Sequence, residues 1–99
     1  MLTSKERATL KKLSNGYDPF VYVGKDGISE TIISESEILI EKRELIKVCV
    51  QRGCELTPKE VCHAFCEKLA CEAVVVVGRR FVIYREAKED SRNLLGRKI

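Results

Sequence analysis

The segment "YVGKDGISE", from Tyr22 to Glu30, places two glycines three residues apart around a lysine and an aspartate. Glycine adopts backbone conformations that other residues avoid, and it lets another backbone approach closely. A loop that leads into a helix also presents unpaired N–H groups at the positive end of the helix dipole. Lys25 adds a flexible cation between the glycines. Together these features predict a loop that holds a polyanion backbone.

The spacing of the glycines distinguishes this loop from other phosphate-binding loops. It matches neither the P-loop G-x-x-x-x-G-K-[ST] nor the dinucleotide fingerprint G-x-G-x-x-G. A clamp on a nucleic-acid backbone, such as the GXXG loop of KH domains, fits Gly24, Lys25, Asp26 and Gly27 better. The alternative is an ordinary strand–helix connection with Asp-Gly as its turn. A clamp would have to turn the Asp26 carboxylate away from the phosphate.

Cysteine and histidine are the other residues with chemical potential. The five cysteines are an odd number, and the chain start lacks the apolar core of a signal peptide, so we expect free thiols and no disulfide framework. Cys62 and Cys66 share a helix face with apolar residues, which favours core packing. With Cys71, Cys54 or His63 they could be drawn as a zinc site, but the spacing matches none of the usual C-x2-C pairs. We therefore expect no metal and no cofactor, and a cysteine-based metal or redox module remains the alternative.

The sequence gives no sign of an enzyme. His63 is the only histidine, and its neighbour Cys62 points about 100° away around the helix, so the two form no nucleophile–base pair there. Paired carboxylates in a recognisable hydrolytic motif are also lacking. We expect a binding protein.

Basic residues gather towards the two ends of the chain. The net charge is +2 over residues 1–27, −3 over 28–44, zero over 45–72 and +4 over 73–99. A polyanion would therefore meet the first predicted helix and a later turn, through Lys5, Arg7, Lys11, Lys12, Arg79 and Arg80. Such residues usually form only a solvated surface, and they make a continuous basic track if helix, glycine loop and turn share one side. Tyr17, Phe20 or Tyr22 could stack on a base, although at least one of the last two is expected to pack inside.

Hydrophobic periodicity and capping signals predict the elements that position these residues. The first helix, residues 3–14, begins with a capping box, the second has Ser29 as its N-cap, and the third begins at Thr57 with Pro58. The predicted strands are Pro19–Val23, Leu45–Val50, Ala73–Val77 and Phe81–Tyr84. The order αβαβαββ predicts a single compact α/β domain with a four-stranded mixed sheet packed with helices.

The run "AVVVV", Ala73–Val77, is continuous and β-branched, so we expect a strand buried on both faces, followed by a hairpin turn. Residues 1–85 should form the domain and residues 86–99 a charged tail, with a little helix around Leu94 and Leu95. No apolar run approaches the roughly 20 residues of a membrane span. We expect a cytoplasmic protein.

The second predicted helix offers a different function. Glu30, Glu37 and Glu41 cluster on one of its faces, which should repel phosphates. A protein-interaction adaptor that binds through this acidic face, with Ile38 as an anchor and without direct RNA contact, is the alternative to a polyanion-binding protein.

Four segments, "LTSKERATLKKL", "VYVGKDGIS", "ELIKV" and "VVVVGRRFVIYR", occur in the order and at about the spacing of the YhbY-like CRM domain, which the chain resembles over residues 2–85. CRM stands for chloroplast RNA splicing and ribosome maturation. The resemblance implies an αβαβαββ fold related to the C-terminal domain of a bacterial translation initiation factor. It also implies RNA binding through Gly24, Lys25, Asp26 and Gly27 and nearby basic surface. For a stand-alone domain it implies association with precursors of the large ribosomal subunit, and thus a role in ribosome biogenesis.

Overall fold

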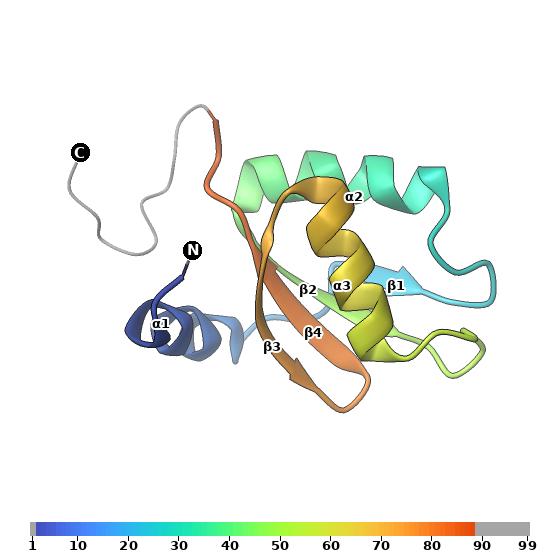
Figure 1. Ribbon diagram of the computed structural model, residues 1–99, viewed down its shortest axis with the longest axis horizontal. Coiled ribbons are helices and arrows are strands. Elements are labelled where there is room, and N and C mark those ends of the chain that lie inside the picture. Colours follow the sequence, from blue (N-terminus) through green and yellow to red (C-terminus); the bar gives the residue numbers. More distant parts are fainter. Residues whose placement is uncertain (1, 89–99) are drawn as a thin grey trace.

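A computed structural model describes residues 2–88 of the chain and shows three helices and four strands within them (Figure 1). In chain order they are α1 (Ser4–Ser14), β1 (Val21–Val23), α2 (Glu30–Arg43), β2 (Leu45–Val50), α3 (Pro58–Leu69), β3 (Glu72–Val77) and β4 (Arg80–Tyr84). The predicted order αβαβαββ is confirmed. None of the helices in this part of the chain has the length and apolar character that crossing a membrane requires.

The helices begin where the sequence signals predicted. Thr3 and Thr57 each accept a hydrogen bond from the backbone N–H three residues later, and the glutamates at those positions bond back to form capping boxes. Ser29 caps α2 by accepting from the N–H of Ile32. These caps fix where each helix starts, and with it the length of the loop that precedes it.

The strands form one mixed sheet in the order β1-β2-β4-β3. β1 pairs with β2 in parallel, and β4 lies antiparallel between β2 and β3. β1, β2 and β3 therefore run in the same direction, as expected for strands that alternate with helices. β1 is shorter than the predicted Pro19–Val23, although the N–H of Phe20 still bonds to the carbonyl of Lys47 at 2.9 Å.

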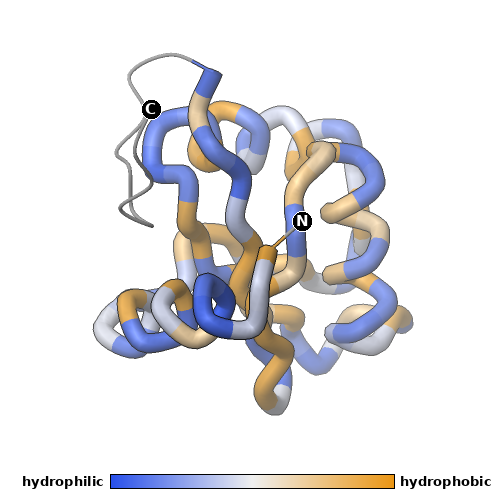
Figure 2. Tube along the Cα trace, turned by 60° about the vertical axis from the view of Figure 1, so that its left-hand side comes forward, coloured by the Kyte–Doolittle hydropathy of each residue, from blue (hydrophilic) through white to orange (hydrophobic). Residues whose placement is uncertain are grey.

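Helices cover both faces of this sheet, α1 on one and α2 with α3 on the other (Figure 1). The larger core lies under α2 and α3, where Phe65 and Phe81 meet edge to face at 5.5 Å. The smaller core joins Leu10 of α1 to Leu45, Val82 and Tyr84. Figure 2 shows apolar residues along the strands and a mixture of apolar and hydrophilic residues along the helices, which is the pattern of helices with one buried side.

The prediction that Ala73–Val77 is buried on both faces is wrong. β3 is an edge strand, and the side chains of Val76 and Val77 are 39% and 63% exposed. The hairpin places β4 inside the sheet instead, so Phe81, Val82, Ile83 and Tyr84 are buried. A continuous apolar run does not tell which strand of a hairpin occupies the centre, because both strands here are rich in β-branched and aromatic residues.

Residues 85–88 pack against the end of α2, and we call this contact the C-terminal clasp. Glu44, the buried C-cap of α2 at φ +64°, accepts the N–H of Arg85 on its carbonyl at 2.9 Å and the N–H of Ala87 on its carboxylate at 2.6 Å. The first residues of the predicted tail thus contact the domain. The helix predicted around Leu94 and Leu95 lies outside the described residues.

Candidate nucleic-acid interface

Three loops meet at one end of the sheet, and we call this region the three-loop edge: residues 24–27, residues 51–54 and the turn 78–79. Because β1 and β2 are parallel, their carboxyl ends lie at the same edge (Figure 1). The N–H of Gln51 bonds to the carbonyl of Val23 at 2.8 Å, and the N–H of Val50 bonds to that of Arg79 at 2.7 Å. Backbone hydrogen bonds therefore tie the ends of these strands together next to the loops.

The glycine loop is a closed turn. The N–H of Gly27 bonds to the carbonyl of Gly24 at 2.9 Å, which leaves Lys25 and Asp26 exposed at the tip. Gly27 has φ +66°, where glycine is favoured over residues with a side chain. At Gly24 an added Cβ would lie 2.6 Å from the Gln51 amide oxygen, so the missing side chain lets the neighbouring loop approach.

Arg79 and Arg80 have different roles although they are adjacent. Arg79 donates from Nε to the carbonyl of Val50 and from Nη2 to that of Gln51, both at 2.8 Å, and so holds the end of β2. Arg80 begins β4 and lies on the face of the sheet that carries α1. Two of the guanidinium donors of Arg79 thus stabilise the three-loop edge, whereas the Arg80 side chain lies on the surface next to the end of α1.

A cavity of about 220 Å³ lies between the end of α1 and this face of the sheet. It is lined by three basic residues, Lys11, Lys47 and Arg80, together with Ser14, Asn15 and valines of the hairpin. Lys47 also donates to the carbonyl of Tyr17 at 2.9 Å. We call this feature the basic cavity. It joins the predicted Lys11 and Arg80 and adds Lys47, which sequence reasoning missed.

An open row of side chains links the basic cavity to the glycine loop. Register pairs Tyr22 with Cys49, Cys49 with Arg80, and Arg80 with Val77. Directly paired residues point to the same face of a sheet, so the row spans all four strands on the side of α1. Tyr22 is 52% exposed and is separated from the glycine loop by one residue, Val23. An exposed aromatic ring therefore lies on the same face of the sheet as Arg80, two strands away.

Phe20 fulfils the expectation that one of the two aromatic residues packs inside. It packs against the larger core, contacts the ring of Tyr17 at 5.8 Å, and has the Arg43 guanidinium 4.6 Å above its ring. Tyr22 is the residue of this group with the ring most available for stacking.

The remaining predicted contacts are less closely connected to the edge. Lys5 and Lys12 are exposed on α1, and neither lines the basic cavity. Arg7 donates to the carbonyl of Ala73 at 3.1 Å, so it anchors α1 to β3.

Arg52, exposed on the loop beside Lys25, was not predicted. The segment "QRGC" after a strand is the signal that would have identified a second glycine-containing loop at the same edge.

Acidic residues of α2 are engaged elsewhere. Arg85 binds Glu37 at 2.5 Å and Glu41 at 3.1 Å, and its hydrogen bond to Glu37 lowers the pKa of that carboxyl below its ordinary value. The predicted acidic cluster thus consists in part of residues that hold the C-terminal clasp. Within residues 2–88, no group of three or more His, Cys, Asp or Glu side chains is arranged to hold a metal ion.

These features define a small αβαβαββ domain with a four-stranded mixed sheet and a cationic loop edge. The model of the CRS1 / YhbY (CRM) domain family matches residues 2–85, and the chain belongs to this family. It is 33% identical over 90 residues to the Bacillus subtilis protein named "Probable RNA-binding protein YqeI", covering 91% of this chain and 94% of that protein. It is 30% identical over 88 residues to a Haemophilus influenzae protein named "RNA-binding protein", covering 89% of each.

A solved structure has the same fold. The solution structure of the hypothetical protein SAV1595 from Staphylococcus aureus superimposes with a TM-score of 0.78 at 40% sequence identity. The match covers 92% of this chain and 95% of SAV1595. The similarity therefore extends over nearly the whole of both chains.

Proposed function

We propose that this protein binds RNA through the three-loop edge and the adjoining basic cavity. The observation that carries the proposal is the convergence of the glycine turn, the loop 51–54 and the arginine turn at one end of the sheet, next to Lys11, Lys47 and Arg80. Membership of the CRM family and relatives named as RNA-binding proteins support it.

In this proposal the protein contacts mainly the phosphate and sugar groups of the RNA. Lys25 and Arg52 are exposed on neighbouring loops, and the N-terminus of α2 follows the glycine turn with its positive dipole end. Within residues 2–88, neither Lys25, Arg52 nor Arg80 forms an ion pair, so these cations are available to an external anion. Phosphate contacts position a protein without reading sequence, and Tyr22 supplies one surface on which a base of any kind can stack.

The cellular role that we propose is assembly of the large ribosomal subunit, with ribosomal RNA or a precursor particle as the partner. It rests on the resemblance to stand-alone CRM domains, because this chain covers 94% of the Bacillus subtilis relative and 95% of SAV1595. The adaptor alternative has less support, since Glu37 and Glu41 already bind Arg85.

Salt titration tests the RNA-binding proposal. The affinity for structured RNA should fall with salt with a log–log slope of roughly −0.7 to −0.9 for each phosphate neutralised. Fragments of large-subunit ribosomal RNA and an unrelated structured RNA of equal length, measured side by side, separate general RNA binding from a ribosomal preference. Absent or salt-independent binding would contradict the proposal and favour the adaptor.

Co-sedimentation tests the cellular role separately. In a gradient of cell extract at low magnesium and moderate salt, the protein should migrate with precursors of the large subunit and not with mature small subunits. Migration only at the top of the gradient, in a protein that binds RNA in vitro, would reject the ribosomal role and leave RNA binding in place.

A further inference from the structure

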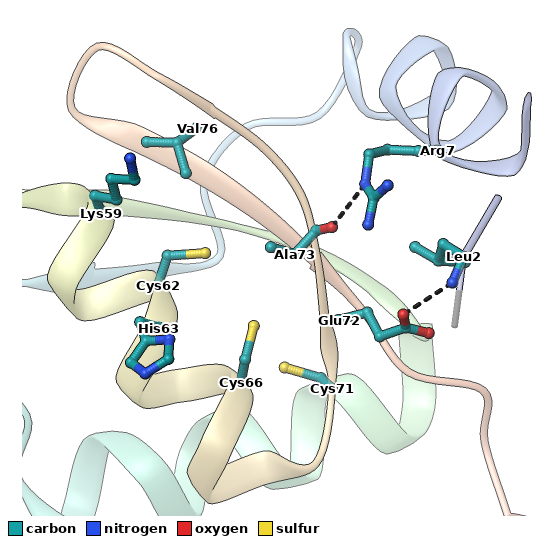
Figure 3. A pocket seen from close by; sticks show the side chains of 10 residues that line it. All are labelled: Leu2, Arg7, Lys59, Cys62, His63, Cys66, Cys71, Glu72, Ala73 and Val76. Carbon is teal, nitrogen blue, oxygen red and sulfur yellow. Dashed lines mark hydrogen bonds between the residues drawn. The ribbon is translucent and has the colours of Figure 1, made fainter. Parts of the chain in front are cut away.

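A second cavity, of about 430 Å³, lies between α3, β3 and the start of α1, away from the three-loop edge (Figure 3). Its lining includes three cysteines, Cys62, Cys66 and Cys71, and three basic residues, Arg7, Lys59 and His63. Figure 3 shows the three sulfur atoms pointing into the space between α3 and β3. RNA binding as proposed above makes no use of this cavity, which we call the cysteine cavity.

The end of α3 brings Cys66 and Cys71 together. Ala70 adopts a left-handed conformation at φ +52°, and its N–H and that of Cys71 both bond to the carbonyl of Cys66. This is the closure of a Schellman-type helix end, in which the side chains at the two cysteine positions are normally in contact. In this protein Cys66 and Cys71 occupy the two positions, so two thiols replace the usual hydrophobic contact.

The two thiols differ in exposure. Cys66 is half-buried and faces the cavity, whereas Cys71 is 8% exposed and points its Sγ at the carbonyl of Phe65, 3.7 Å away. Cys62, one helical turn before Cys66, is also buried. An external reagent therefore meets Cys66 before the more deeply buried Cys71.

Neighbouring groups favour the thiolate of Cys66. Interaction with the thiol of Cys62, and then with that of Cys71, lowers the pKa of Cys66 well below the usual value for a thiol; burial opposes the shift, and the charge of His63 assists it. The pKa values of Cys62 and Cys71 are raised in turn by the same interactions with Cys66 and by burial.

The charged groups around this thiolate come from every element that lines the cavity. They are Lys59 and His63 of α3, Arg7 of α1, Glu72 of β3, and Arg85, which acts on Cys71. Four of these have partners. His63 contacts Glu67 at 3.0 Å, and Glu72 accepts the N–H of Leu2 at 2.9 Å. Arg7 donates to the carbonyl of Ala73, and Arg85 binds the glutamates of the C-terminal clasp. The cavity lining thus places two permanent cations, Arg7 and Lys59, against the one carboxylate of Glu72, and nearby cations favour a thiolate.

We propose that Cys66 and Cys71 form a reversible disulfide by exchange with a small-molecule disulfide of the glutathione type. The Cys66 thiolate attacks one sulfur of the small disulfide, forms a mixed disulfide and releases the first small thiolate. Cys71 then gives its proton to solvent, attacks the Cys66 sulfur and releases the second small thiolate. The protein loses two hydrogens, and the small disulfide is reduced to two thiols.

Competitive alkylation of the reduced, full-length protein tests the first step. Iodoacetamide should modify Cys66 about tenfold faster than Cys49 at pH 6, where a thiol with the usual pKa is almost wholly protonated and thiolate content outweighs the lower nucleophilicity of an acidic thiol. Cys49 is a suitable reference because it is also half-buried and lies outside the cavity. The ratio should shrink as the pH approaches 8.5, which exposure alone would not produce. Equal rates at pH 6 would overturn the proposal.

Oxidised glutathione and peptide mapping by mass spectrometry test the second step. The wild-type protein should yield a Cys66–Cys71 disulfide, and Cys71→Ser should stop at the glutathione adduct of Cys66. Cys49→Ser should still form the Cys66–Cys71 disulfide. A Cys62–Cys66 disulfide, or a stable adduct on wild-type Cys66, would overturn the assignment. The result for the wild-type protein tests the proposal even if Cys71→Ser fails to fold. Neither experiment involves RNA, so failure of the disulfide proposal would leave the RNA-binding proposal unaffected.

Discussion

The two ends of the sheet both gather charged side chains but use them differently. At the C-terminal clasp, Arg85 bonds to Glu37, Glu41 and the carbonyl of Leu69, and its side chain is 12% exposed. At the three-loop edge, Lys25 and Arg52 are exposed and form no ion pair within residues 2–88. Charges that find partners inside the molecule stabilise the fold, whereas charges left to solvent are available for another molecule.

This difference shows why net charge alone does not locate a binding surface. The segment from residue 73 onward is the most basic part of the chain, yet Arg79 and Arg85 bond largely to backbone carbonyls and glutamates of the same protein. Lys47 lies in a segment with no net charge, yet it lines the basic cavity. The placement of each cation by the fold decides which of the two roles it has.

The largest effect should follow from removing the central residue of the clasp. Arg85→Ala should lower the free energy of unfolding by about 2 kcal/mol, because charge-assisted hydrogen bonds are lost and the Leu69 carbonyl loses its donor. Its RNA affinity, at a temperature where the variant is folded, should stay within about twofold of the wild type, since Arg85 lies at the opposite end of the sheet from the three-loop edge and distant sites act independently. Urea denaturation and RNA titration of the same sample measure both.

Lowering the pH should weaken the ion pair between Arg85 and Glu37 in the wild-type protein. Because the folded-state pKa of Glu37 is lowered, the stability that its ion pair contributes is present above the unfolded pKa and is lost as the pH falls through the folded pKa. The stability difference between wild type and Arg85→Ala should therefore narrow as the pH is lowered below about 4, the usual range of a glutamate pKa. A difference that stays constant on acidification would show that the guanidinium acts through the Leu69 carbonyl and packing alone.

Reversing one charge at the three-loop edge should give the opposite pattern. Lys25→Asp should weaken RNA binding about tenfold or more and reduce the salt slope by about one unit, because one phosphate contact is lost and a second carboxylate joins Asp26. Its stability should change by no more than about 0.5 kcal/mol, as for most exposed loop substitutions. RNA titration and thermal unfolding provide the two readings.

Lys42→Asp is the matched control for this charge reversal. Lys42 is exposed in the last turn of α2, and the length of that helix places it about 20 Å from the glycine turn. It should weaken binding far less than Lys25→Asp. Equal losses in the two variants would mean that net charge explains binding and that the glycine turn is only a connection.

Tyr22 provides a smaller test of the same edge. Tyr22→Ala should reduce the affinity for RNA with unpaired bases about fivefold, at the lower end of what base–aromatic stacking contributes. Tyr22→Phe keeps the ring and should bind like the wild type, while affinity for a fully paired duplex should change in neither variant. A loss shared by Tyr22→Phe would point to the hydroxyl group and would exclude stacking as the cause.

The sequence predicted local structure better than position in the sheet. Thr3, Ser29 and Thr57 were identified as caps because capping depends on residues three positions apart. The edge position of β3 and the role of Lys47 were missed because both depend on strand order and on where α1 crosses the sheet. Those are long-range contacts, and no short segment encodes them.

The same limit applies to the candidate site. The two flanking glycines predicted a loop at Lys25 and Asp26, and the structure shows this loop as a turn with both residues exposed. The contact between Gly24 and Gln51 was not predictable, because it joins loops from two strands whose pairing the local pattern does not specify. The engagement of Arg79 with two carbonyls had no sequence signal either, since an arginine in a turn is most often solvated.

The smallest effects should separate the two glycines of the turn. Gly27→Ala places a side chain at φ +66°, so it should cost about 1 kcal/mol of stability even though nothing lies within 4 Å of the added carbon. Gly24→Ala should cost no more than about 0.5 kcal/mol, because the atom it meets is the end of the flexible Gln51 side chain, which can turn away.

The proposed RNA contact predicts the reverse order of effects on RNA affinity, with the larger loss in Gly24→Ala. Gly24→Ala pushes the Gln51 amide aside and so alters the contact between two of the loops proposed to bind RNA, whereas the Cβ of Gly27 enters open space. Unfolding and RNA titration of both variants therefore give a crossed pattern if Gly24 serves close approach and Gly27 serves turn geometry. Affinity losses that simply follow the stability losses would show that both glycines only shape the turn.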